Sequence, residues 1–381
     1  MTGDWVPGRR KTVLFVNDSL AMGGIETMIR DFALGLDPQR YAAAVAVFRP
    51  GGQLAEELLR AGMSVTSLDK RDGLDIGLVF RLRRHIREVG ATVVHSHNYS
   101  AWFYCALASA GLRDVRLVHT EHSRVMPLAR RRWLERWLSR VTRAVVAVSG
   151  DVARSLVHDI GVDRRRVGLI ANGVNLTRFR PDDVARRAMR TALGIRDGAV
   201  VFGILARLVP VKSHKTLVEA FRQLRQRIPD AHLIIAGDGP CRAELERQIA
   251  EAGLDGHVHL LGEVHDGERV LNGLDVYVLS SVDEGMNLTL LEAMGTALPV
   301  IATAVGGNPE VVTSGETGLT VPALQPAAMA EAMETLARDR ELRRAMGVRG
   351  RARVEEAFSQ RRTLEDYMSL YDGDPVHAWQ G

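Results

Sequence analysis

Short apolar runs rich in β-branched residues alternate with longer amphipathic stretches along this chain, and that alternation constrains the fold more than any other feature. Strands separated by helices predict parallel βαβ units, whose strands are buried on both faces and lack polar alternation, as residues 145–148 do. We expect two series of strands, separated by a polar, turn-prone segment at 172–181. The first series comprises 12–16, 43–48, 92–95, 115–119 and 144–148, and the second 200–205, 231–236, 258–261, 275–279 and 299–303.

Two series of strands imply two domains. The chain has 381 residues, so each domain would have about 180, an ordinary size for one hydrophobic core. We predict an α/β protein with two Rossmann-like, doubly wound domains, at 1–178 and 179–360, facing each other across a cleft. Residues 361–381 begin with an amphipathic stretch and are expected to pack back on the first domain. A ligand is expected at the carboxyl ends of the strands, where helix N-termini and glycine loops gather.

The composition excludes several classes of protein. With 25% charged and 46% hydrophobic residues, the chain is neither disordered nor fibrous. Its two cysteines, Cys105 and Cys241, are far apart and form no CxxC pattern, which argues against a disulfide framework and a structural zinc site. The apolar run after Arg9 and Arg10 is too short for a signal peptide, and no window approaches a membrane-spanning length. We expect a cytoplasmic protein, with association with the inner face of the membrane as an open alternative.

Positive charge is concentrated in the first half of the chain. Residues 1–172 contain 26 Lys and Arg against 17 Asp and Glu, whereas the remainder contains 24 against 29, within a net charge of +4. Segment 124–143 holds seven arginines and one acid, with Trp133 and Trp137 at helical spacing. Such a helix could lie on an anionic membrane, or its tryptophans could simply pack it onto the sheet. Nucleic acid is not an expected partner, because no recognised module accompanies the charge. The arginines are Arg124, Arg130, Arg131, Arg132, Arg136, Arg140 and Arg143.

The strongest candidate for a ligand site follows the strand predicted at 275–279. Glu284 would lie on the loop and Glu292 two turns into the next helix, so both carboxylates could face a ligand. Backbone N–H groups at the start of that helix would meet an anion between them. Carboxylates are also good acceptors for sugar hydroxyls. The alternative is that Asn287 caps an ordinary helix and that both glutamates face solvent.

Two further strand-to-helix loops carry residues suited to phosphate. Arg207 and Lys212 stand five residues apart, a spacing at which both cations could hold a diphosphate, although a solvated pair is an equally ordinary arrangement. Gly23 and Gly24 could let a ligand approach the backbone, or could form a plain tight turn. Segment 237–240 is expected to be another such turn, and it lacks the GxGxxG pattern of nicotinamide enzymes.

Polar residues end two strands of the first domain, at the edge where open α/β sheets bind ligands. A zinc site built from the four histidines among them is the alternative, but no HExxH spacing accompanies it, so we predict no metal site. The residues are His95, His97, Asn98, His119, Glu121 and His122.

In their order along the chain, these segments resemble the family 4 retaining glycosyltransferases, whose fold is GT-B. The resemblance covers nearly the whole chain, and the ordered set of motifs is highly specific. The string at 284–294 and the Gly-Gly-Asn-Pro-Glu at 306–310 are also similar to a subgroup associated with exopolysaccharide assembly. The motifs lie at 23–26, 170–175, 207–212, 237–240, 284–292, 299–302 and 306–310.

The resemblance implies that a sugar moves from a UDP- or GDP-linked donor to a hydroxyl of a glycan or lipid-linked acceptor, with retained anomeric configuration. No metal ion or other cofactor is implied. The pathways expected are bacterial exopolysaccharide, lipopolysaccharide or glycolipid assembly. An epimerase or hydrolase on the same frame, or a non-catalytic nucleotide-sugar-binding protein, remains the alternative.

The resemblance also assigns roles to residues of this sequence. Arg207 and Lys212 would bind the donor diphosphate, Glu292 the ribose, and Glu284 the transferred sugar. His119 matches the histidine near the reacting carbon, so the catalytic set is Glu284, His119, Arg207 and Lys212. Further donor contacts are implied for Gly23, Gly24, Val264, Gly285, Met286, Asn287 and Leu288, and acceptor contacts are expected from His97, Asn98, Glu121 and His122.

Two departures from the family pattern leave the donor sugar open. Ala206 and Ser213 stand where the family usually has glycine on either side of the phosphate-binding cations. Met286 and Asn287 replace the commoner Phe-Gly after the first glutamate.

Overall fold

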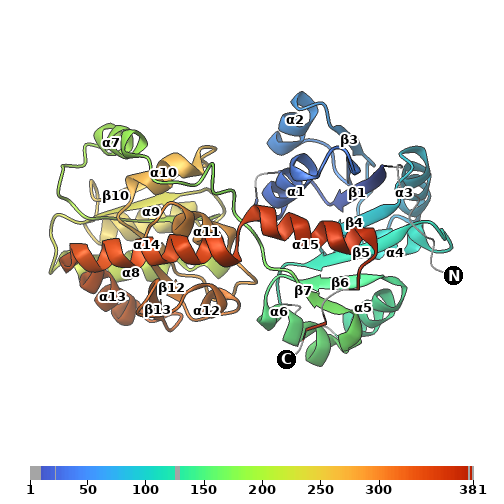
Figure 1. The fold of residues 1–381 in the computed structure, drawn as a ribbon. Coiled ribbons are helices and arrows are strands. Elements are labelled where there is room, and N and C mark those ends of the chain that lie inside the picture. The colour runs from blue at the N-terminus through green and yellow to red at the C-terminus, as the bar shows by residue number, and fades with distance from the viewer. Residues whose placement is uncertain (1–9, 22, 125–128, 376–377, 380–381) are drawn as a thin grey trace. The chain divides into compact units, whose positions relative to one another are not determined.

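The chain folds into two compact units, which Figure 1 shows as ribbons. The computed structural model describes residues 10–21, 23–124, 129–375 and 378–379. The first unit comprises residues 1–171 and 363–381, and the second comprises 172–362. Residues 172–178, which we assigned to the first domain, therefore belong to the second unit. The reason is their hydrogen bonding, because Asn172 Nδ2 donates to the carbonyl of Met286 and the Val174 N–H donates to that of Phe358.

The first unit is built on a parallel sheet in the order β3-β2-β1-β4-β5-β6-β7. Its central strands are continuous apolar runs buried on both faces, as the sequence predicts. The edge strands β3 and β7 were not predicted, because they are short and β3 is the polar string Ser-Val-Thr-Ser. The strands are β1 (Lys11–Asn17), β2 (Tyr41–Val47), β3 (Ser64–Ser67), β4 (Val93–His97), β5 (Arg116–Glu121), β6 (Ala144–Ala147) and β7 (Val167–Leu169).

Helices connect these strands and cover both faces of the sheet. In Figure 1, α3, α4 and α5 lie along one side of the sheet, and neighbours in that row contact each other. After β3 the chain returns across the sheet, so that β4 lies on the other side of β1 from β2. Right-handed crossover connections are the rule in such parallel sheets. The helices are α1 (Gly24–Gly35), α2 (Gln53–Arg60), α3 (Ile76–Glu88), α4 (Tyr99–Ser109), α5 (Ala129–Val141), α6 (Gly150–Arg154) and α15 (Gln360–Asp372), with the π-helical turn η1 (Ser155–Ile160) and the 3₁₀ turn η2 (Arg164–Arg166).

Helix α15 is the segment by which the end of the chain returns to the first unit. Tyr367 packs its ring 5.1 Å from that of Phe32 on α1. Its hydroxyl lies 2.9 Å from Thr120 Oγ1, and the Tyr371 hydroxyl lies 2.6 Å from His95 Nδ1. Both tyrosines are buried, so α15 contributes to the core of the first unit.

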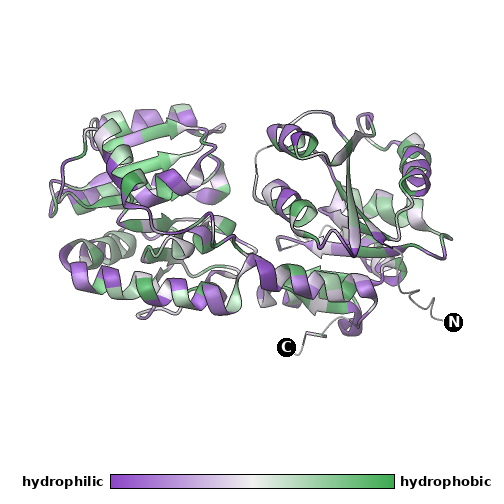
Figure 2. Ribbon diagram, turned by 45° about the horizontal axis from the view of Figure 1, so that its top comes forward, coloured by the Kyte–Doolittle hydropathy of each residue, from purple (hydrophilic) through white to green (hydrophobic). Residues whose placement is uncertain are grey.

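The second unit has a parallel sheet in the order β10-β9-β8-β11-β12-β13. Five of its strands match the predicted series, and the sixth, the edge strand β13, was missed because Gly318 and Thr320 interrupt its apolar pattern. Figure 2 shows apolar colour along the strands and polar colour on the outer helix surfaces. The strands are β8 (Val201–Leu205), β9 (His232–Ala236), β10 (Val258–Gly262), β11 (Val276–Leu279), β12 (Val300–Thr303) and β13 (Gly318–Val321).

The helices of the second unit again cover both faces of its sheet. Helix α7 packs on α10, α13 on α8, and α14 on α11. Several begin at side-chain caps, as α7 does at Asp182 and α14 at Asp339. The helices are α7 (Asp183–Ala192), α8 (His214–Arg225), α9 (Arg242–Glu251), α10 (Gly267–Gly273), α11 (Leu288–Gly295), α12 (Asn308–Val311), α13 (Pro326–Arg338) and α14 (Arg340–Ala357), with the 3₁₀ turn η3 (Pro210–Lys212).

Candidate active site

Glu284, on the loop between β11 and α11, is held by three donors that reach one of its carboxylate oxygens. Oε1 lies 2.6 Å from Lys212 Nζ, 2.6 Å from Ser281 Oγ and 3.0 Å from Asn287 Nδ2. The side chain is only 9% exposed, so its charge needs these partners. Within the part of the chain that the structure describes, Oε2 has no hydrogen-bond partner, and it is not enclosed. One oxygen is anchored, and the other is available to a ligand.

Lys212 reaches Glu284 because the loops after β8 and β11 are hydrogen-bonded to each other. The Val282 N–H donates to the carbonyl of Val211 at 2.8 Å, and Ser280 Oγ donates to that of Lys212 at 2.8 Å. β8 and β11 are neighbours in the sheet, so both loops start from the same edge. The two charges lie on loops that are far apart in the sequence, and the order of the strands brings them together. Ser281 was not predicted as a site residue, although it follows the strand closely.

Arg207 lies on the same loop as Lys212, but its side chain is exposed. Among the described residues it has no ion-pair partner, so its guanidinium can bind an anion. The loop backbone is held by the end of β9, where the Leu208 N–H donates to the carbonyl of Asp238 at 2.9 Å. At Gly237 a side chain would overlap the carbonyl of Ala206, which explains the glycine there.

The two departures from the family pattern have different structural outcomes on this loop. Ser213 adopts φ +48°, a left-handed conformation that glycine adopts more easily, so the backbone shape is kept without glycine. Ala206 is half-buried and needs no such conformation.

The start of α11 combines both alternatives that the sequence left open. Asn287 does cap the helix, since its Oδ1 accepts from the Leu290 N–H at 2.8 Å. Its Nδ2 donates to Glu284 Oε1, however, so the cap also orients a carboxylate whose side chain is largely buried. Met286 is buried, and Glu292 is half-buried on the second turn of α11. Gly285 and Leu288 complete this turn.

A second loop, after β12, fixes the backbone of Glu284. The Gly307 N–H donates to the carbonyl of Gly285 at 3.0 Å, and Thr303 Oγ1 donates to that of Ser281 at 2.6 Å. Gly306 has φ +52°, and a Cβ there would overlap the carbonyl oxygen of Glu284. The sequence marks this Gly-Gly string as a family motif, and the structure gives it a local role in supporting the Glu284 loop.

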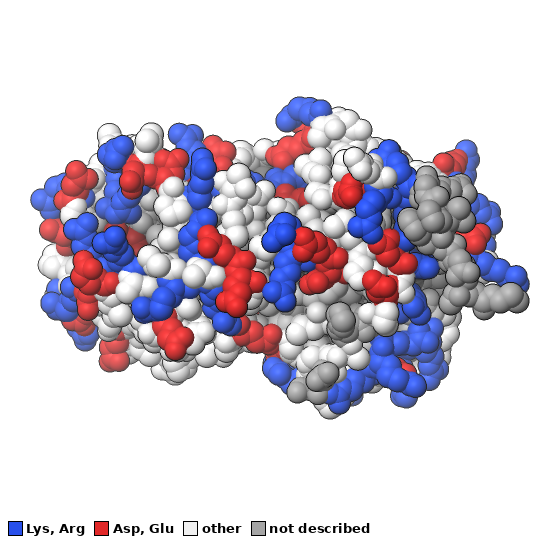
Figure 3. All heavy atoms as spheres, in the orientation of Figure 1, with Lys and Arg blue, Asp and Glu red and all other residues white. Residues whose placement is uncertain are grey.

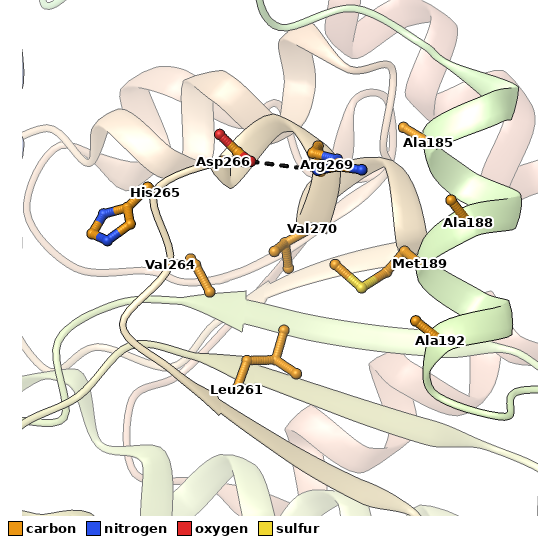
Figure 4. A pocket seen from close by; sticks show the side chains of 10 residues that line it. All are labelled: Ala185, Ala188, Met189, Ala192, Leu261, Val264, His265, Asp266, Arg269 and Val270. Carbon is orange, nitrogen blue, oxygen red and sulfur yellow. Dashed lines mark ion pairs between the residues drawn. The ribbon is translucent and has the colours of Figure 1, made fainter.

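A cavity of about 340 Å³ lies between α7 and the segment that joins β10 to α10 (Figure 4). Its walls are mostly apolar, and Val264 is among them. Polar groups come from the turn after Val264, where Asp266 and Arg269 approach within 3.6 Å. The residues that line the cavity are Ala185, Ala188, Met189, Ala192, Leu261, Val264, His265, Asp266, Arg269 and Val270.

In the first unit, Gly23 and Gly24 form the entry to α1. Gly23 is the extended N-cap residue, and Gly24 begins the helix. Asn17 at the end of β1 donates from Nδ2 to Glu26 Oε1 at 3.1 Å and accepts from Asn98 Nδ2. Asn98 also caps α4. The glycine loop is thereby connected to the end of β4.

The polar residues of β4 and β5 divide between the two faces of the sheet, because successive residues of a strand point to opposite sides. Ser96 and His119 are partners in the register and share one face, while His97 and Thr120 share the other. His122, just after β5, joins the second group, with Nε2 3.1 Å from His97 Nδ1. The polar residues that end these two strands therefore form two groups, one on each face of the sheet.

His119 lies inside β5 and is fully buried. Its ring stacks on Trp102 of α4, with centroids 4.1 Å apart and planes 6° from parallel. Nδ1 lies 3.2 Å from the Ser96 carbonyl, and Nε2 lies 3.5 Å from Glu121 Oε2. Trp102 was not predicted to contact His119, because its position in a helix four residues after Asn98 gives no indication of this stacking.

His95, His97 and His122 are uncharged near neutral pH. Burial, with repulsion from neighbouring histidines, holds the pKa of His95 and of His97 well below the ordinary value. Burial likewise lowers the pKa of His122 to about 4. For Glu121, burial raises the pKa of the carboxyl, but its hydrogen bond with His119 lowers that pKa more, so the net direction is downward.

The basic segment is described only in part. Residues 125–128 and the side chains of 129–131, which include Arg130 and Arg131, lie outside the described residues. On α5, Trp133 is 72% exposed and does not pack on the sheet, whereas Trp137 is half-buried. Figure 3 shows Lys and Arg gathered over this part of the first unit. The exposed, described arginines of α5 are Arg132, Arg136 and Arg140.

Two further features are absent from the described residues. No helix among them has the length and apolar character to cross a membrane. No group of three or more His, Cys, Asp or Glu side chains among them is arranged to hold a metal ion.

Comparisons with known proteins match both halves of the chain. Residues 22–178 match the family model described as Glycosyltransferase Family 4, and residues 185–353 match that described as Glycosyl transferases group 1. The chain is 28% identical over 315 residues to the putative glycosyltransferase EpsD of Bacillus subtilis, which covers 79% of this chain and 81% of EpsD. It is 28% identical over 246 residues to the UDP-Gal:alpha-D-GlcNAc-diphosphoundecaprenol alpha-1,3-galactosyltransferase of Escherichia coli, covering 61% of this chain and 63% of that protein.

A solved structure supports the same assignment of the fold. HepE from Anabaena, in complex with UDP and glucose, aligns with a TM-score of 0.84 at 21% identity, over 95% of this chain and 99% of that chain. The two parallel sheets described above are those of the GT-B architecture. The chain therefore belongs to the family 4 glycosyltransferases and has the GT-B fold.

Proposed function

We propose that this protein transfers a sugar from a nucleoside diphosphate donor to an acceptor hydroxyl with retention of anomeric configuration. The observation that carries the proposal is the Lys212–Glu284 pair beside the exposed Arg207, at the ends of adjacent strands. Two cations and a carboxylate with one open oxygen suit a diphosphate next to a sugar.

The chemistry needs charge neutralisation more than a protein nucleophile. As the C1–O bond to the diphosphate breaks, Arg207, Lys212 and the N–H groups at the start of α11 would stabilise the departing phosphate. The acceptor oxygen bonds to C1 on the same face, and its proton passes to the departing phosphate oxygen. Glu284 already accepts three hydrogen bonds at Oε1, so its open oxygen is suited to holding sugar hydroxyls. Glu292, farther along α11, would hold the ribose.

The order of the strands indicates how the nucleotide-sugar donor would be oriented along the edge of the sheet. Val264 and the cavity follow β10, whereas the charged loops follow β8 and β11. Three strand spacings separate β10 from β11, about 14 Å in all. We assign the base to the Val264 end and the sugar to the Glu284 end. Both UDP and GDP remain candidates for the nucleotide, and the known UDP complex of HepE favours UDP.

In the first unit, we assign contact with the substrates to His122 and not to His119. His119 is fully buried against Trp102, whereas His122 is half-buried at the end of β5. Gly23 and Gly24 would lie beside the phosphates, and His97, Asn98 and Glu121 would support the acceptor side.

For the acceptor, we propose a lipid-linked glycan in cell-surface polysaccharide assembly. The E. coli relative is named for a diphosphoundecaprenol acceptor, which supports this class. The exposed Trp133 and arginines of α5 would bring the first unit to an anionic membrane from the cytoplasmic side.

The proposal is tested by thermal shift with UDP- and GDP-sugars, followed by transfer to a lipid-linked acceptor and NMR analysis of the new linkage. A bound donor raises apparent stability by mass action. Glu284→Gln keeps the shape but loses the charge and should abolish transfer while donor binding persists. An inverted linkage, full activity of Glu284→Gln, or conversion of the donor without an acceptor would each contradict the proposal.

A further inference from the structure

His97 and His122 form a pair at the ends of β4 and β5. His97 Nδ1 lies 3.1 Å from His122 Nε2, and the two rings are stacked at 28° with centroids 5.4 Å apart. His97 is fully buried, whereas His122 is half-buried. The partner of His122 is thus a ring that solvent does not reach.

Two neutral imidazoles at this distance must share one N–H, so only two arrangements exist. Burial keeps the pKa of both rings well below neutral, to about 4 for His122, so neither carries a proton in excess at pH 7. Either His97 donates from Nδ1, or His122 donates from Nε2.

The second nitrogen of His97 decides between these arrangements. Within the part of the chain described, His97 Nε2 is buried without a hydrogen-bond partner. If His122 were the donor, this nitrogen would carry a buried N–H with no acceptor. If His97 is the donor, it carries only a lone pair. Orphaned buried N–H groups are rarer and costlier than under-satisfied acceptors, so His97 donates.

We propose that His97 is a positioning residue that fixes His122 with its proton on Nδ1, so that His122 offers substrates an N–H donor and cannot act as a base. His122 Nδ1 has no partner among the described residues and is not enclosed. The oxygen that it meets, on a sugar or a phosphate, follows from the proposed function. The tautomer does not depend on that function.

The surroundings of the pair favour this uncharged state. The ring of His95 lies 4.1 Å from that of His97 and is itself hydrogen-bonded at both nitrogens, to Tyr371 and Thr120. Glu121 is the nearby acid, but its Oε1 accepts from the backbone N–H of His122 at 3.2 Å and not from the ring.

The decisive experiment is NMR of the whole protein with ¹⁵N-labelled histidine, assigned with single-histidine variants. We expect the His122 and His97 rings each to carry the proton on Nδ1 at pH 7. A wild-type His122 protonated on Nε2, or on both nitrogens, would overturn the proposal. This measurement needs no substrate, so it stands even if transfer is never observed.

Two variants test the consequence for catalysis. His97→Phe keeps the ring shape but removes the donor, and it should give His122 a mixture of tautomers. Transfer should then lose about tenfold in kcat, the value of one hydrogen bond, with KM for the nucleotide sugar unchanged. His97→Asn retains an N–H donor close to Nδ1 and should restore most of the loss. An unchanged tautomer and kcat in His97→Phe would show that His97 only fills space.

Discussion

The indole of Trp102 and the imidazole of His119 lie face to face, 4.1 Å apart, with their planes 6° from parallel. The Trp102 Nε1 also donates to Thr142 Oγ1 at 2.8 Å, so the stack is fixed from behind. Since both rings are fully buried, the contact holds α4 on β5. The stack gives His119 a role in packing, whereas His122, just after β5, is half-buried.

We expect His119→Ala and His122→Ala to fail in different ways. Truncating the buried His119 ring leaves a cavity beside Trp102 and should lower the free energy of unfolding by about 2–4 kcal/mol. His122→Ala should change stability by less than about 1 kcal/mol but lower kcat by at least about tenfold. Urea unfolding and steady-state transfer assays distinguish these effects. A stable His119→Ala with strongly reduced kcat would return the catalytic role to His119.

Lys212→Ala should damage stability and donor binding together. The carboxylate of Glu284, only 9% exposed, would lose its cation, and an unpaired buried charge costs about 3 kcal/mol or more. Nucleotide-sugar affinity should also fall, because the diphosphate loses a counter-charge. The matched control is Lys215→Ala, whose pair with Glu244 is about half exposed and should contribute less than about 1 kcal/mol. Equal effects of the two variants in thermal unfolding would argue against this account.

Gly306→Ala should displace the backbone of Glu284. The new Cβ would overlap the Glu284 carbonyl, in addition to the roughly 1 kcal/mol cost of a left-handed alanine. Gly315→Ala provides the comparison, because Gly315 also has a positive φ, of +84°, but has open space around it. We expect Gly306→Ala to be clearly less stable than Gly315→Ala and to lose transfer activity. Similar melting temperatures and activities would mean that the loop yields without moving Glu284.

His214 at the start of α8 should make stability depend on pH. The ring is 3% exposed, and both nitrogens lack partners among the described residues. Burial, with the charge of Lys212, lowers its pKa from 6.5 to about 4. The unfolded chain therefore binds the proton first as pH falls from 6.5 toward 4, and stability is lost across that window, on the order of 1–3 kcal/mol.

His214→Leu should flatten this part of the pH profile. It should be as stable as the wild type, or more so, at pH 7, because two unsatisfied polar atoms are removed. The matched control variant replaces the exposed His158 by leucine. Chemical unfolding at several pH values between 4 and 7 is the measurement. An unaltered slope in His214→Leu would assign the acid sensitivity to other groups.

Helix α5 should bind anionic vesicles. Changing Arg132, Arg136 and Arg140 together to glutamine should lower partitioning by about two orders of magnitude, at about 1 kcal/mol for each arginine. The effect should weaken with salt. The matched control is the same change at three exposed arginines of the second unit, Arg187, Arg247 and Arg344. Sedimentation with phosphatidylglycerol vesicles measures both, and strong binding to neutral vesicles would indicate another mechanism.

Most of the fold could be predicted because the central strands are apolar runs that nothing else explains. Strands β8 and β11 were placed within one residue, at Val201–Leu205 and Val276–Leu279. The missed strands β3, β7 and β13 lie at sheet edges, where one side needs no apolar neighbour. Their sequences are therefore short and mixed, and local pattern cannot identify them.

Site residues could be predicted where charged side chains lie on loops. They were harder to predict where burial in the sheet determines whether a side chain can reach a ligand. Family motifs located Lys212 and Glu284, and the structure adds that they form one pair. The position of His119 in the sheet was predicted wrongly because of a small error in strand length. The predicted strand ended at His119, which placed that residue at the edge, whereas β5 continues to Glu121. Because the strand is two residues longer than predicted, His119 lies within the sheet and not at its edge.

The return of α15 to the first unit has a consequence for how the chain is made. Tyr367 and Tyr371 occupy the core next to His95, yet they are synthesised after every residue of the second unit. The first unit emerges from the ribosome first, but part of its apolar core stays uncovered until the second unit has been synthesised and α15 follows. Folding of the first unit on the ribosome is therefore expected to be a late event, and truncation directly after Arg362 would leave the second unit whole and the first without Tyr367 and Tyr371.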